Sequence, residues 1–271
     1  MKAQLEAIKK YCWDGAWWIR GFDDDGIPLG SHSCEHGQIW LNSQTWAVLA
    51  DCGPQKLQVT AMDSVAQILD TPCGIKKLHP SFPTFPEASD AFSGYSLGAG
   101  ENGAIFCHSN AWAVIAECLL HRSDRAWKYF EQLVPHLSLQ RSGLARYQCE
   151  PYAYASSIIG PENPRYGLAT LTHVTGTAAW MDVAATQYLL GIRPVLDGLK
   201  FAPCLPHDWP GFTATRMYRG TRLDIDVRNP GDPMARVGAL FVNGQRYRGD
   251  VLEPVWIKGK ETARIELEWV S

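Results

Sequence analysis

The sequence predicts a mainly α protein: a partial (α/α)6 barrel over residues 1–197, followed by a smaller, jelly-roll-like all-β domain over residues 198–271. Two observations support this prediction. Before about residue 197, apolar residues recur at helical spacing in segments joined by long loops; after it, short segments alternate apolar with polar residues. The helical part holds too few helix pairs to close a ring, so apolar helix faces would lie open, which indicates an incomplete barrel.

Helical patterns end at clear stop signals. The run Thr71-Pro72-Cys73-Gly74 ends one helix, and Ser123-Asp124 can cap another. The predicted helices cover about 45–50, 55–70, 110–120, 125–133 and 176–190. The two long loops between them, about 76–103 and 138–173, are candidates for function, because long loops in compact domains usually carry it.

The C-terminal region has the period of a β-strand. Residues 212–227 and 263–270 alternate apolar with polar side chains. Asn243-Gly244 stands between strand-like flanks, and this dipeptide strongly favours the two-residue turn of a β-hairpin. These patterns predict an all-β domain that contains a hairpin.

Composition excludes several classes of protein. The formal charge of −3 gives no basic excess for nucleic acid, and no apolar run is long enough to cross a membrane. The N-terminal residues lack the apolar core of a signal peptide, so we expect a cytoplasmic location. The eight cysteines include no C-x-x-C pair, so we expect reduced thiols and no metal site. The eleven tryptophans fit either a large core or a sugar-binding cleft.

Two helix beginnings could bind an anion. His108 opens one predicted helix beside Ser109 and Asn110, and Thr175-Gly176 precede another. Free backbone N–H groups and the helix dipole both favour negative charge at such ends. The alternative is ordinary capping, and spacing alone favours it.

Ordered motifs along the chain resemble the cellobiose/chitobiose phosphorylase family, glycoside hydrolase family 94. The series comprises Trp13-Asp14-Gly15-x-Trp17, Gly37-Gln38-Ile39-Trp40-Leu41-Asn42, Glu101-Asn102-Gly103-x-Ile105-Phe106-Cys107-His108, Glu150-Pro151-Tyr152, Thr175-Gly176-Thr177-Ala178-Ala179-Trp180, Leu190-Gly191-Ile192-Arg193-Pro194, Asp197-Gly198-Leu199 and Pro203-Cys204-Leu205-Pro206. Each motif alone is weak, but their order is specific.

The resemblance implies an enzyme that cleaves a β-linked disaccharide or oligosaccharide with inorganic phosphate, inverting the anomeric carbon to give an α-sugar 1-phosphate. It implies that His108, Thr175 and Gly176 bind phosphate and that Glu101 binds the acceptor sugar. Tyr152 and Ser156 fall in the substrate-binding segment; Ser156 stands where relatives often have Gln. His173 stands where relatives often have Trp, so the identity of both sugars is open.

The family's general acid, an Asp in a D-W-N-D-like segment, has no counterpart in this sequence. An inverting mechanism needs an acid to protonate the leaving oxygen, so we expect no catalytic residue here and no activity of the isolated chain. We expect no cofactor beyond phosphate as co-substrate. The chain could form a homodimer or require a missing N-terminal half.

Three alternatives remain open. The chain could be a non-catalytic, sugar- or phosphate-binding remnant of a split gene. It could be one chain of a two-chain enzyme. It could also be a hydrolase that uses an Asp or Glu of its own, which would release sugar without phosphate.

Overall fold

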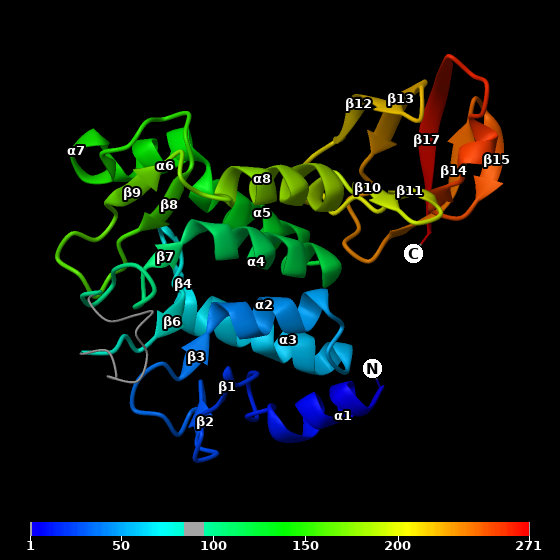
Figure 1. The fold of residues 1–271 in the computed structure, drawn as a ribbon. Helices are drawn as coiled ribbons and strands as arrows, with labels where there is room; N and C mark the ends of the chain where they lie inside the picture. The colour runs from blue at the N-terminus through cyan, green and yellow to red at the C-terminus, as the bar shows by residue number, and fades with distance from the viewer. Residues whose placement is uncertain (1, 84–94, 271) are drawn as a thin grey trace. The chain divides into compact units, whose positions relative to one another are not determined.

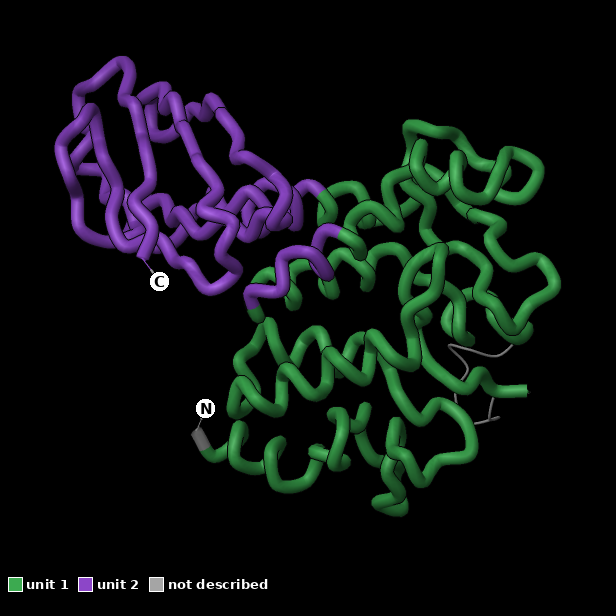
Figure 2. Tube along the Cα trace, turned by 180° about the vertical axis from the view of Figure 1, so that it is seen from behind, with its two compact units in different colours: residues 1–120, 128–181 green, residues 121–127, 182–271 purple. Residues whose placement is uncertain are grey.

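The computed structural model describes residues 2–83 and 95–270. The chain divides into two compact units (Figure 2). Unit 1 comprises residues 1–120 and 128–181, and unit 2 comprises residues 121–127 and 182–271. The predicted domain boundary near residue 198 stays a prediction.

Unit 1 contains most of the helices. They are α1 (Lys2–Tyr11), α2 (Leu41–Leu49), α3 (Gln55–Ser64), α4 (Cys107–Leu119), α6 (Pro135–Ser142) and α7 (Leu144–Tyr147), together with most of α5 (Ser123–Leu133) and α8 (Thr177–Val183). α3 continues into a π-helical segment, Val65–Leu69. Helix α2 packs against both α3 and α4 (Figure 1).

The loops of unit 1 are paired into short antiparallel strands. Two-residue pairs form between β1 (Gly21–Phe22) and β2 (Pro28–Leu29), β3 (Ile39–Trp40) and β6 (Leu78–His79), and β4 (Asp70–Thr71) and β5 (Gly74–Ile75). A three-stranded sheet joins β7 (Ile105–Phe106), β8 (Ala155–Ile158) and β9 (Ala169–Thr172).

These strands overturn the prediction of a mainly α fold. The protein is 33% helical and 28% strand, with several sheets. Buried backbone N–H and C=O groups must be paired, and in the long loops the short strands do this. A two-residue strand is too short to show alternation, so hydrophobic periodicity could not reveal it.

The Asn110 side chain connects α4 to strands β5 and β7 by hydrogen bonds. Its Oδ1 accepts a hydrogen bond from the Ile75 backbone N at 2.7 Å. Its Nδ2 donates to the carbonyls of Ile75 at 2.9 Å and Phe106 at 3.0 Å. The helix begins at Cys107, earlier than predicted, so Asn110 lies in its first turns and is not the cap. The fully buried amide instead holds β5 beside the start of α4.

Unit 2 contains two sheets. The smaller sheet has the order β10 (Ile192–Val195), β11 (Gly198–Phe201) and β16 (Val251–Leu252). The larger has the order β12 (Gly211–Tyr218), β13 (Thr221–Arg228), β17 (Thr262–Val270), β14 (Arg236–Val242) and β15 (Gln245–Arg248). β13 and β17 are parallel, and the other neighbours are antiparallel.

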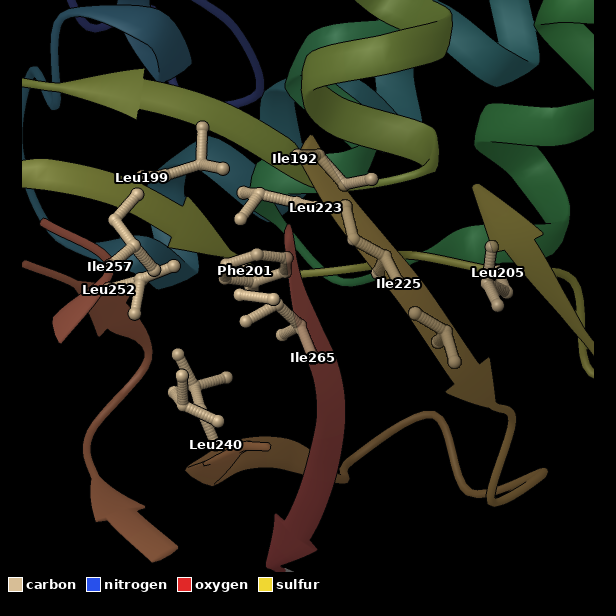
Figure 3. Packing of buried hydrophobic residues seen from close by; sticks show 13 residues of the cluster. Ile192, Leu199, Phe201, Leu205, Leu223, Ile225, Leu240, Leu252, Ile257 and Ile265 are labelled. Atoms are coloured by element: carbon tan, nitrogen blue, oxygen red, sulfur yellow. The ribbon is translucent and has the colours of Figure 1, made fainter. Parts of the chain in front are cut away.

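The alternation predicted for this region is confirmed. Leu223 and Ile225 of β13 and Ile265 of β17 point inward with Phe201 to form the core (Figure 3). The predicted hairpin joins β14 and β15, with Asn243 and Gly244 at positive φ of 51° and 80°, as the primed turns require.

Candidate functional site

His108 and Gly176 lie close together although they are far apart in sequence. His108 is the second residue of α4, and Gly176 comes immediately before α8. A Cβ at position 176 would lie 3.1 Å from Cε1 and 3.2 Å from Nδ1 of the imidazole. The structure therefore brings together the two elements of the predicted phosphate site, and the absence of a side chain at Gly176 leaves room for the ring.

The surroundings of the His108 imidazole favour its uncharged form. Burial lowers its pKa, and the positive charge of Lys77 lowers it further. Its Nε2 is buried and has no hydrogen-bond partner among the described residues. The Nδ1 atom lies on the side of the ring that faces Gly176, and a neutral imidazole can donate or accept one hydrogen bond there.

Thr175 takes part in local capping. Its Oγ1 accepts a hydrogen bond from the Thr177 backbone N at 3.1 Å and lies 2.7 Å from the Thr177 hydroxyl. Thr177 in turn donates to the Ala155 carbonyl at 3.2 Å, which ties the start of α8 to β8. The capping alternative therefore accounts for the Thr175 hydroxyl, while Gly176 stays exposed at the same turn.

Glu101 is presented by a tightly fixed loop. Its neighbour Asn102 is fully buried and exchanges two 2.8 Å hydrogen bonds with the backbone of Phe82. Gly103 has a φ of 82°, and a Cβ there would lie 2.0 Å from the Ser81 hydroxyl, so only glycine fits. The E-N-G motif thus combines one accessible carboxylate with two residues that fix its loop.

Lys77 pairs with Glu101 and was not found by sequence reasoning. The Lys77 side chain is 8% exposed and that of Glu101 23%. The Lys77 Nζ also lies 4.4 Å from the centroid of the Phe106 ring. Burial and the nearby charge of Arg20 lower the pKa of Lys77 to about 8. The available signal was a lysine pair inside an otherwise apolar segment, between Ile75 and Leu78.

The remaining predicted sugar residues lie on and before β8. Ser156 is half-buried within β8, and Tyr152 is 79% exposed on the preceding loop. Glu150 lies 3.7 Å from His173, and backbone and Thr172 hydrogen bonds, with the charge of His173, lower its pKa. Among the described residues, neither Tyr152 nor Ser156 hydrogen-bonds to His108 or Glu101, so the structure does not join them to the phosphate pair.

A row of tryptophans borders His108. Its ring centroid lies 4.8 Å from that of Trp112 and 6.0 Å from that of Trp180. Trp46 packs edge-on against Trp112 at 5.2 Å and is 44% exposed. Trp112 thus packs between Trp46 of α2 and Trp180 of α8, as expected of a core residue, while Trp46 stays partly exposed.

Comparison with known protein families shows which family this chain belongs to. The model of the glycosyl hydrolase 94 superfamily catalytic domain matches residues 1–191. The chain belongs to this superfamily. The model of the glycosyl hydrolase family 65 C-terminal domain matches residues 192–232. The resemblance inferred from the ordered motifs is therefore confirmed.

Several curated relatives of this glycosyl hydrolase 94 protein are phosphorylases. The solabiose phosphorylase of Paenibacillus borealis is 34% identical over 91% of the chain and 32% of its own length. The N,N'-diacetylchitobiose phosphorylase of Vibrio proteolyticus is 37% identical over 91% of the chain and 31% of its own length. The chain therefore spans about a third of the length of these relatives.

A solved GH92 α-mannosidase from Bacteroides thetaiotaomicron matches 97% of the chain and 29% of its own, with 13% identity and a TM-score of 0.38. This likeness is too distant to bear on fold or function. Within residues 2–83 and 95–270, no helix combines the length and apolar character needed to cross a membrane.

Proposed function

We propose that this chain supplies the phosphate-binding side of the active site of an inverting β-glycoside phosphorylase. The observation that supports it most directly is the closeness of Gly176 to the His108 imidazole. This pair lies in a positively charged environment, because the Lys77 charge acts on His108 and that of Arg20 acts on Lys77. Such surroundings favour a small anion over a neutral ligand.

In this proposal, phosphate takes the place of the activated water of an inverting hydrolase. His108 and the Thr175-Gly176 turn hold it so that one oxygen faces the anomeric carbon of the donor sugar, and positioning lowers the barrier. As that bond forms, the glycosidic bond breaks on the opposite face and a general acid protonates the leaving oxygen. Glu101 binds the departing acceptor, and Tyr152 and Ser156 contact sugar.

The general acid itself is not among the residues that resemble the family pattern. We therefore propose that the chain needs a complementary polypeptide for turnover, either an N-terminal half or a second chain. The substrate is a β-linked disaccharide or oligosaccharide. A homodimer and the predicted cytoplasmic location remain predictions.

Calorimetry with inorganic phosphate tests the anion site directly. We expect saturable binding to the chain and its loss in His108→Ala. His136, exposed on α6, provides a matched control, and His136→Ala should bind as the wild type does. Equal affinity in the wild type and His108→Ala would contradict the proposal.

Activity assays separate the proposal from its alternatives. Incubation with phosphate and cellobiose or N,N'-diacetylchitobiose should give no sugar 1-phosphate from this chain alone. Release of sugar 1-phosphate would show that the chain contains its own acid. Release of free sugar without phosphate would favour a hydrolase.

A further inference from the structure

Lys77 is held rigidly at the centre of the strand layer. Its backbone N donates to the Ala104 carbonyl at 2.8 Å, and its carbonyl accepts from the Leu41 N at 2.9 Å. These bonds fix the backbone of Lys77 between β5 and β6, and its side chain is 8% exposed. A buried ammonium is costly unless it is paired, and its retention in a fixed position needs a reason.

Among the described residues, the ammonium has a carboxylate partner and a positively charged neighbour. Glu101 pairs with it, and the Phe106 ring supplies a cation–π contact. Arg20, which lies over the Trp40 ring at 4.2 Å, acts on Lys77 through its charge. Two cations and one carboxylate leave the cluster with excess positive charge beside a neutral His108.

An anion bound at His108 would relieve this imbalance. The Lys77 Nζ lies over the Phe106 ring. The Phe106 and His108 rings are stacked, with their centroids 6.4 Å apart and their planes 19° from parallel. The Lys77 charge already reaches the imidazole, because it lowers the pKa of His108. A charge that acts on His108 also acts on a ligand held by it.

We propose that Lys77 is a further anion-binding residue, whose ammonium is shared between Glu101 and the phosphate held by His108 and Gly176. This proposal rests on the proposed function. Glu101 then competes with phosphate for the same ammonium. The acceptor-side carboxylate and the phosphate site are coupled through one lysine.

Two substitutions test this coupling. Each removes one charge, and they should shift the phosphate affinity in opposite directions. In Lys77→Gln we expect phosphate to bind about tenfold more weakly or worse, because a charge-assisted contact is lost. In Glu101→Gln we expect phosphate to bind more tightly, because Lys77 is released. A purely structural salt bridge would weaken binding in both variants or in neither, and either result would overturn the proposal.

Lys76 supplies the matched control. It is the adjacent lysine, its side chain is 6% exposed, and it pairs with Glu162 at 3.1 Å and His79 at 2.8 Å instead of with Glu101. Lys76→Gln should leave phosphate affinity unchanged. Circular dichroism of each variant confirms folding, and Lys77→Arg, which keeps the charge, should retain most of the affinity if Lys77→Gln misfolds.

A second measurement requires no ligand. Removing the Lys77 charge should raise the pKa of the His108 imidazole, followed by the NMR shift of its Cε1 proton and assigned with His108→Ala. No change in that titration would overturn the coupling. If His108→Ala abolishes phosphate binding while Lys77→Gln does not weaken it, the proposed function stands and this inference fails. If the wild type does not bind phosphate, both fail.

Discussion

The two units place similar ion pairs in opposite environments. On the outer face of the large sheet in unit 2, Arg246 and Glu268 form a bidentate pair with side chains 53% and 33% exposed. In unit 1, Lys77 and Glu101 pair with side chains 8% and 23% exposed. Water screens the first pair, so it contributes little, while the second acts in a medium that transmits its charge. The buried pair can therefore act on a nearby ligand, whereas the exposed pair interacts mainly with water.

The largest expected effect is on the framework of unit 1. Asn110→Ala removes three hydrogen bonds to buried backbone groups of Ile75 and Phe106. We expect a loss of about 3 kcal/mol in the free energy of unfolding, because buried partners are left unsatisfied. Urea denaturation followed by tryptophan fluorescence measures it. Asn229→Ala in unit 2 also removes three hydrogen bonds, but from a half-buried side chain, so it is the comparison and should cost less.

Gly176→Ala should affect the site more than the fold. Its Cβ would come within 3.1 Å of the imidazole and displace it. We expect phosphate affinity to fall roughly tenfold, equivalent to about 1.4 kcal/mol, with little change in thermal stability. Ala178→Ser, at an exposed position in α8 two residues further on, should bind phosphate normally. Unchanged affinity in Gly176→Ala would place phosphate elsewhere.

Phosphate binding should weaken as the pH rises through about 8, where Lys77 loses its proton. The direction follows because burial and Arg20 lower the Lys77 pKa, and only the protonated amine attracts an anion. His108 is already neutral there, since its own pKa is lowered. Calorimetry across this range measures the fall, and Lys77→Arg should remove it, because a guanidinium stays charged. A fall that persists in Lys77→Arg would exclude Lys77 as its cause.

The smallest effect is expected at the exposed pair. Arg246→Ala should have the same midpoint of unfolding and the same phosphate affinity as the wild type, because the side chains of Arg246 and Glu268 are both solvated. A salt titration of stability should likewise show no difference between the two proteins. A clear loss in the variant would mean that the sheet face is less well solvated than its exposure indicates.

Local chemistry made unit 2 predictable, because strands of four to nine residues show alternation and Asn-Gly specifies its turn. Unit 1 was harder. Residues 138–173 were predicted as a long loop, yet α6 begins at Pro135, a position where proline loses no hydrogen bond, and extends to Ser142. Among site residues, His108 and Gly176 were recognisable by motif. Lys77 was not, because its role depends on pairing with Glu101, which is distant in sequence. Two adjacent lysines ordinarily indicate a solvent-exposed segment.

The position of β17 has a consequence for how unit 2 is made. This last strand lies at the centre of the large sheet, between β13 and β14, although both are synthesised earlier (Figure 1). Until Thr262–Val270 leave the ribosome, β12–β13 and β14–β15 are separate hairpins that each expose an unpaired edge. Completion of this sheet is therefore a late, long-range event during translation, and the two hairpins must avoid pairing with neighbouring nascent chains until it occurs.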